Sequence, residues 1–184
     1  MILETQPEII KNDSWMCPKN QVVIGANMKQ EKTNVMRILD AHKIEYKSYS
    51  YIGTDVISGV EVAKVLNQNE AQVFKTLVTI GHSKEHYVFV IPVAKELDLK
   101  KAAKAVGEKS IEMIKQKDLL SLTGYIHGGC SPIGMKKFFK TTFDISAQNF
   151  NTIIFSAGKI GYQVEVSLEN LSKVISFSLG DVCI

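Results

Sequence analysis

The stretch Gln72–Val93, QVFKTLVTIGHSKEHYVFVIPV, decides the fold class of this chain. Two runs rich in valine, isoleucine, phenylalanine and threonine flank the polar segment GHSKE at 81–85. Such β-rich runs joined by a short segment that contains glycine are typical of a β-hairpin. We therefore expect two antiparallel strands here, as part of a larger sheet.

Helices and further strands are predicted on both sides of this hairpin. Asp98 can cap a helix over LDLKKAAKAVG that Gly107 ends, and Ser58 with Glu61 forms a capping box before another helix. A further helix is predicted by an apolar stripe at Val35, Ile38, Leu39 and His42. Strands are predicted at IEYKSYSYI, IEMI, FFKTTFD, TIIFSAG and YQVEVS. Short helices are predicted at KDLLSLTG and SAQNF, and a last helix at SLENLSKVIS. Because strict βαβ alternation is absent, we expect a single α/β domain of the α+β type, with a mixed, barrel-like sheet flanked by helices.

The composition is that of an ordinary globular domain, with 45% hydrophobic and 22% charged residues in a chain of 184. Residues 1–27 show no clear hydrophobic period, so we expect an irregular or accessory extension before one domain at 28–184. No apolar run approaches the roughly 18 residues that span a bilayer, and the first residues lack a basic signal-peptide start. Three widely spaced cysteines (Cys17, Cys130 and Cys183) fit a reduced, cytoplasmic setting.

Positive charge is concentrated in the middle of the chain. The net charge is +3, but residues 73–150 hold twelve lysines and seven acidic residues, a local excess of five. These lysines include Lys136 and Lys137 in MKKFFK. A lysine-rich face suits a polyanion, because each neutralised phosphate releases counterions. A plain solvated surface is the alternative interpretation.

Lys75 is the unusual residue of the hairpin. Alternation along the strand places it on one face with Val73 and Leu77, among apolar neighbours. An unpaired ammonium between two buried faces would be costly. The amine therefore either reaches solvent from an edge strand or meets an anionic ligand in a cleft.

The segment GYIHGGCSPIG (Gly124–Gly134) predicts a tight loop. Gly128, Gly129 and Gly134 permit positive φ, while Pro132 fixes a bend and favours extended geometry at Ser131. Such a loop can direct successive N–H groups into a concavity that binds a carbonyl or an anion, or it can be a structural turn. SAGKIG (156–161) is a second glycine turn, which a plain hairpin would also explain.

Metal and thiolate chemistry have weak support. His127 and Cys130 are close in sequence, but no second pair completes a zinc-type spacing, and no cofactor motif is present. A Cys130 nucleophile would have only His127 as a nearby base. We therefore expect no metal and no cofactor.

In order and spacing, four segments together resemble the YbaK/EbsC family, namely VFKTLV, PVAKELDLKKAAKAVG, GYIHGGCSPIGMKK and SAGKIGYQVEV. The resemblance extends from about Met28 to the C-terminus. That family is related to the editing domain of bacterial prolyl-tRNA synthetases. The resemblance implies a compact α/β domain that deacylates mischarged tRNA, most often cysteine on tRNA(Pro). The implied partners are the 3′ acceptor end of aminoacyl-tRNA and prolyl-tRNA synthetase, and neither a membrane nor DNA is implied.

The resemblance also implies roles for individual residues. Lys75 would be the functional lysine that anchors the phosphate or ribose of the terminal adenosine. Substrate-binding positions would be Tyr51, the loop residues Gly128, Gly129, Cys130, Ser131, Pro132 and Gly134, and Ser156, Ala157, Gly158 and Gly161 of the second turn. Lys136 and Lys137 would contact the tRNA, and Gln163 matches a polar position that varies. The substrate's own thiol would attack its ester carbonyl and leave as a cyclic thiolactone.

Three alternatives remain open from the sequence. One is a deacylase for another small amino acid, such as alanine, that uses a bound water. A second is a non-catalytic module that binds tRNA or prolyl-tRNA synthetase. A third is a metal-dependent hydrolase that uses His127 and Cys130.

Overall fold

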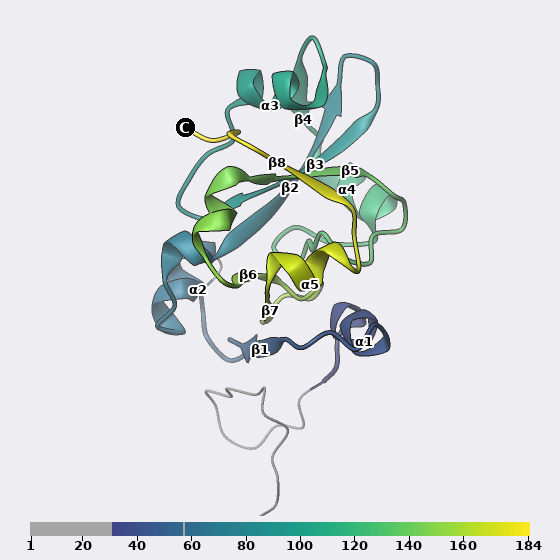
Figure 1. Ribbon diagram of the computed structural model, residues 1–184. Helices are drawn as coiled ribbons and strands as arrows, with labels where there is room; N and C mark the ends of the chain where they lie inside the picture. Colours follow the sequence, from purple (N-terminus) through teal and green to yellow (C-terminus); the bar gives the residue numbers. More distant parts are fainter. Residues whose placement is uncertain (1–30, 57) are drawn as a thin grey trace, which may run out of the picture.

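The computed structural model describes residues 31–56 and 58–184, so the predicted extension at 1–27, with Cys17, lies outside the described residues (Figure 1). The elements, in chain order, are α1 (Asn34–Ala41), β1 (Lys47–Ser50), α2 (Gly59–Val65), η1 (Glu70–Gln72), β2 (Phe74–Gly81), β3 (His86–Pro92), α3 (Leu99–Val106), β4 (Ile111–Met113), α4 (Gln116–Thr123), β5 (Lys140–Asp144), η2 (Ile145–Asn149), β6 (Ile153–Ser156), β7 (Tyr162–Val166), α5 (Leu168–Ser172) and β8 (Phe177–Gly180). In this described part, no helix combines the length and apolar character needed to cross a bilayer.

The strands form two sheets. One has five strands in the order β4-β2-β3-β5-β8, with antiparallel pairs around β2 and parallel pairs on both sides of β5. The other has three antiparallel strands in the order β1-β7-β6. A parallel bridge between Val73 and Ile154 links the start of β2 to β6. The predicted α/β domain with a mixed sheet is therefore confirmed, and its strands are divided between two linked sheets.

The predicted hairpin is the antiparallel pair β2–β3, in which Lys75 lies opposite Ile91. One face of the hairpin contributes Phe74 and Val78 to the main core, which also includes residues of α1, β6 and β7. The other face contributes Ile91 to a second cluster that α3 covers. Both faces of the hairpin are therefore packed, as its continuous apolar runs require.

The predicted caps are confirmed. The Ser58 hydroxyl accepts a hydrogen bond from the Glu61 N–H, and the Glu61 carboxylate accepts one from the Ser58 N–H, which closes the capping box of α2. Asp98 accepts from two N–H groups at the start of α3, and Gly107 ends that helix with φ of 81°. These local signals fix where the helices begin and end.

Two helix predictions need correction. His42 is not part of the buried stripe of α1, because it is the exposed C-cap residue, and Met36 is buried instead. The last helix ends at Ser172, and the chain then forms β8, which pairs in parallel with β5. The ring of Phe177 packs against that of Phe143 with 4.8 Å between centroids, so a long-range contact overrides the local pattern here.

Candidate functional site

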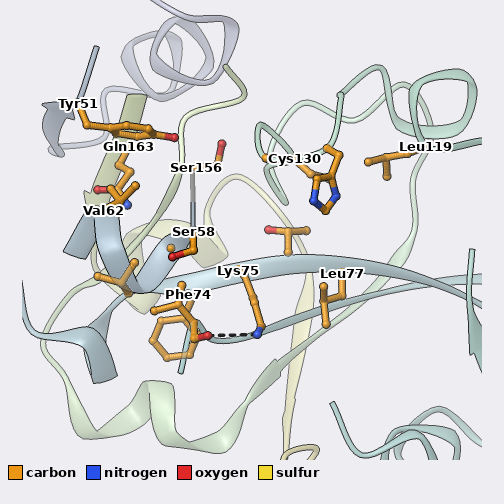
Figure 2. A pocket seen from close by; sticks show the side chains of 16 residues that line it. Tyr51, Ser58, Val62, Phe74, Lys75, Leu77, Leu119, Cys130, Ser156 and Gln163 are labelled. Carbon is orange, nitrogen blue, oxygen red and sulfur yellow. Dashed lines mark hydrogen bonds between the residues drawn. The ribbon is translucent and has the colours of Figure 1, made fainter. Parts of the chain in front are cut away.

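A cavity of about 250 Å³ lies where β2, the start of α2 and the glycine loop approach β6 and β7 (Figure 2). It brings together segments that are far apart in the chain. Its lining consists of Tyr51, Ser58, Gly59, Val62, Val73, Phe74, Lys75, Thr76, Leu77, Val93, Leu119, His127, Gly128, Cys130, Ser156 and Gln163. The predicted residues Tyr51, Lys75, Gly128, Cys130 and Ser156 therefore meet at one cavity.

The two glycine turns pack directly against each other. Gly128 has φ of 81°, a conformation that favours glycine, and it turns the chain into the cavity wall. Gly129 has no positive φ, but a Cβ atom there would lie only 3.2 Å from the main-chain nitrogen of Ile160 in the second turn. Gly129 is therefore required for close approach, and not for the left-handed conformation that the sequence suggested.

Tyr125 contacts both glycine turns. Its buried hydroxyl donates a hydrogen bond of 2.5 Å to the carbonyl oxygen of Ile133. Its side chain also lies against Gly134 and Gly158, since a Cβ atom at either glycine would approach it within 3 Å. The loop is thus held by a core tyrosine, which fixes the backbone that faces the cavity.

The backbone of the loop offers one candidate donor at the cavity. The Gly129 N–H is occupied, because it donates to the Ile126 carbonyl oxygen over 3.0 Å. The N–H groups of Cys130 and Ser131 donate to no residue within 31–56 or 58–184. Of these two residues only Cys130 is part of the cavity lining, so its N–H is the candidate donor of this loop at the cavity, while Ser131 is fully buried outside the lining.

The Cys130 thiol is poorly suited to act as a nucleophile. Only 8% of the residue is exposed, and burial raises the pKa of the thiol to about 12. A thiol with so high a pKa is almost entirely protonated at neutral pH, and the thiolate is the reactive form. The side chain of Cys130 therefore contributes shape to the cavity, while its backbone contributes a donor.

Two polar side chains of the lining lack protein partners. The hydroxyl oxygen of Thr76 and the amide oxygen Oε1 of Gln163 are buried, and neither has a hydrogen-bond partner in the described part of the chain. Buried polar atoms are nearly always hydrogen-bonded in proteins, so these two are available to a ligand. Thr76 was not among the residues predicted from the sequence. A threonine between Phe74 and Val78, on the strand face that packs in the core, could have indicated a polar group inside the domain.

Lys75 contributes to the lining, but its amine is directed elsewhere. In Figure 2 the side chains of Lys75 and Leu77 lie on the other side of β2 from Cys130 and Ser156. The Lys75 amine donates to the Val93 carbonyl oxygen over 3.1 Å, and burial lowers the pKa of this half-buried group. An ammonium has three protons to donate, so this one bond leaves further donor capacity.

The remaining predicted positions fall into two groups. Tyr51 is tied to the second turn by a hydrogen bond from its N–H to the Gly161 carbonyl oxygen, over 2.9 Å, and Ser156 precedes that turn. Several predicted residues shape the loops and are not part of the cavity lining, namely Gly129, Ser131, Pro132, Gly134, Ala157, Gly158 and Gly161. Lys136 and Lys137 are exposed on the segment that follows the glycine loop.

Metal ligation has no structural support in the described residues. No group of three or more histidine, cysteine, aspartate or glutamate side chains is placed there so as to hold a metal ion. His127 and Cys130 both line the cavity, but no third ligand of these types joins them.

The chain is similar to known proteins over most of its length. Residues 55–174 match the family model described as "Aminoacyl-tRNA editing domain". A protein of Enterococcus faecalis (strain ATCC 700802 / V583) named "Putative Cys-tRNA(Pro)/Cys-tRNA(Cys) deacylase EbsC" is 46% identical over 154 residues, which cover 83% of this chain and 94% of that protein.

Solved structures share the fold. The crystal structure of "a putative trans-editing enzyme for prolyl tRNA synthetase" matches with a TM-score of 0.73 at 20% identity, over 82% of this chain and 94% of that one. A crystal structure of a hypothetical protein matches with a TM-score of 0.74 at 20% identity, over 82% and 99% of the two chains. The family match runs from the segment between β1 and α2 to just past α5. Together with the 46% identical relative, it establishes that the chain belongs to the family of aminoacyl-tRNA editing domains.

Proposed function

We propose that this protein is a free-standing deacylase that removes cysteine from mischarged tRNA(Pro), and also from tRNA(Cys). The name of the 46% identical relative gives this substrate pair for that protein. The observation that carries the proposal is the cavity itself, which combines unpaired hydrogen-bonding groups with a cysteine thiol whose pKa is raised. Such a site suits a substrate that supplies its own nucleophile.

The reaction proceeds by attack of the substrate's thiol sulfur on its own ester carbonyl carbon. A carbon–sulfur bond forms, the bond between that carbon and the ribose oxygen breaks, and the thiol proton ends on the ribose hydroxyl. The products are a cyclic thiolactone and deacylated tRNA. The N–H group of Cys130, which lines the cavity, stabilises the developing negative charge on the carbonyl oxygen.

Lys75 and the unpaired polar groups bind and orient the substrate. The Lys75 ammonium contacts the phosphate or ribose of the terminal adenosine, while Thr76 and Gln163 hydrogen-bond to the aminoacyl group. Holding the thiol against its own carbonyl contributes through proximity, because the reacting groups already belong to one molecule. The enzyme therefore acts by orientation and electrostatics.

The cavity also provides a second site at which the aminoacyl group is selected. A hydrophobic synthetase pocket separates near-isosteric side chains by only about 10–200-fold, and cysteine is close to proline in size. A cavity of about 250 Å³ accommodates a small aminoacyl group such as cysteine. An independent editing step of this kind corrects the error that the first site cannot avoid.

The setting of this activity follows from its substrate. A deacylase for charged tRNA acts where translation takes place, in the cytoplasm, and prolyl-tRNA synthetase is the partner that generates its substrate. The unit that carries the activity is residues 28–184, with residues 1–27 as an accessory extension.

A panel of charged tRNAs tests the proposal. Purified protein is incubated with tRNA(Pro) carrying cysteine, alanine, serine or proline, and with Cys-tRNA(Cys), and the loss of each ester is followed. We expect rapid loss of cysteine from both tRNAs and little loss of proline. Preferred removal of alanine would assign the protein to alanine editing, and no removal of any amino acid would make it a binding module.

A further inference from the structure

Phe138 exposes its aromatic ring to an unusual degree. The residue is 81% exposed, the highest value for a large hydrophobic residue in the described part of the chain, whereas its neighbour Phe139 is 9% exposed and packs in the main core. Exposing a phenyl ring to water is unfavourable. A ligand that covers Phe138 would remove this unfavourable exposure.

A second cavity, of about 230 Å³, lies beside this ring. Its lining is Pro132, Gly134, Met135, Lys136, Lys137, Phe138, Phe139, Thr141, Ile175 and Ser176. The floor is largely apolar, and this lining holds two lysines and no acidic residue. The glycine loop contributes Gly128 and Cys130 to the first cavity and Pro132 and Gly134 to the second, so one loop serves both.

The two lysines leave positive charge next to the exposed ring. Lys136 lies along the end of α4, where its amine donates to the Leu120 carbonyl oxygen over 3.4 Å. Lys137 makes no hydrogen bond or ion pair with any residue that the structure describes, and it is exposed. An aromatic face flanked by unneutralised ammonium groups is the combination that binds unpaired nucleotides, through base stacking and phosphate contacts.

We propose that Phe138 stacks on an unpaired base of the tRNA's single-stranded 3′ end, with Lys136 and Lys137 against the adjoining phosphates. This inference rests on the proposed function, because it places the strand that leads to the ester in the first cavity. A nucleobase fits one exposed ring and a small hollow, whereas a stable protein partner needs about 800 Å² on each side. The base contact is independent of sequence, since every base has an aromatic face.

The test compares the binding of two deacylated RNAs. One is intact tRNA(Pro), and the other is the same tRNA without its single-stranded 3′ end. Dissociation constants are measured by fluorescence anisotropy at several salt concentrations for the wild type, Phe138→Ala, Phe138→Trp and Lys137→Gln. The control variant is Ile145→Ala, which also removes a half-exposed apolar side chain (49% exposed), but from η2.

We expect Phe138→Ala to weaken binding of intact tRNA roughly 5- to 150-fold, the range for loss of one stacked base. The log–log salt slope should stay unchanged, because no phosphate contact is lost, and Phe138→Trp should retain affinity. Lys137→Gln should instead reduce the slope by about 0.7, the value for one phosphate contact of a single strand. Truncated tRNA should bind the wild type and Phe138→Ala equally, and Ile145→Ala should match the wild type.

Unchanged affinity of Phe138→Ala for intact tRNA, or an equal loss for the truncated tRNA, would overturn the inference. Loss of affinity in Phe138→Trp would also contradict stacking. Deacylation of Cys-tRNA(Pro) is measured in parallel with the same proteins. If the wild type deacylates and Phe138→Ala binds normally, only this inference fails, whereas a wild type that neither binds nor deacylates removes the proposed function as well.

Discussion

The amine of Lys75 donates a hydrogen bond to the main-chain carbonyl oxygen of Val93 over 3.1 Å, across the β2–β3 hairpin end. Val93 in turn packs against the start of α2, where a Cβ atom on Gly59 would come within 2.5 Å of its side chain. Both Val93 and Gly59 line the first cavity. Lys75 therefore supports one wall of the site through its bond to Val93.

Lys75→Ala is expected to abolish most deacylation while the protein remains folded. The variant loses the ammonium for the nucleotide and the bond to Val93, but it also removes a charge whose burial is unfavourable, as its lowered pKa indicates. Single-turnover deacylation and thermal melting measure the two effects. Lys104→Ala, an exposed lysine of α3, is the matched control. Turnover near that of the wild type would remove Lys75 from the site.

Thr76→Val is expected to lower kcat/KM for Cys-tRNA(Pro) by roughly 2- to 10-fold, the usual worth of one hydrogen bond. Its melting temperature should stay the same or rise, because the variant replaces an unpartnered buried hydroxyl with a methyl group. Thr79→Val, in the same strand, is the control. Its hydroxyl bonds to the Tyr87 carbonyl oxygen, so this change should cost stability without affecting kcat/KM. The opposite pattern in the pair would contradict our assignment of Thr76.

Gly129→Ala is expected to destabilise the protein by about 1–3 kcal/mol and to reduce activity, because the added methyl group overpacks the contact between the two glycine turns. Gly180→Ala is the control, since a Cβ atom there would meet only ordinary contacts at 3.5 Å or more. Denaturant unfolding and deacylation are compared for both. Equal tolerance of the two changes would show that the turns do not need this close approach.

Cys130→Ser is expected to keep deacylation within several-fold of the wild type. The loop acts through its backbone, and the thiol, with a pKa raised to about 12, holds almost no thiolate at neutral pH. Rates are measured with and without a chelator. A folded Cys130→Ser protein without activity would restore the thiolate mechanism, and chelator inhibition reversed by zinc would restore the metal mechanism.

Local chemistry made much of the fold predictable. The hairpin, the Ser58–Glu61 capping box and the αL glycine at Gly107 depend on neighbours in sequence, and each is where the sequence indicated. Strand β8 was missed because its pairing with β5 joins residues 36 positions apart, such as Thr142 and Ser178. No local sequence pattern indicates which distant strand β8 pairs with.

Part of the cavity lining could be predicted from the sequence, but the arrangement of its side chains could not. Glycine turns and an isolated lysine indicated Gly128, Ser156 and Lys75, and the cavity contains all three. The direction of the Lys75 amine depends on Val93, and the burial of the Thr76 hydroxyl without a partner depends on how the two sheets meet. These relations arise only from packing between distant segments.

The central claim is that the substrate's own thiol performs the reaction, and one measurement tests it directly. Cysteinyl, seryl and alanyl esters of the same tRNA(Pro) are compared in rate, and the product released from cysteinyl-tRNA is trapped and identified. A thiol is far more nucleophilic near neutral pH than a hydroxyl, and alanine has neither group. We predict fast release of a thiolactone from the cysteinyl ester and little reaction of the other two. Equal rates for alanyl and cysteinyl esters, with only free cysteine recovered, would show that a bound water hydrolyses the ester and would contradict attack by the substrate's thiol.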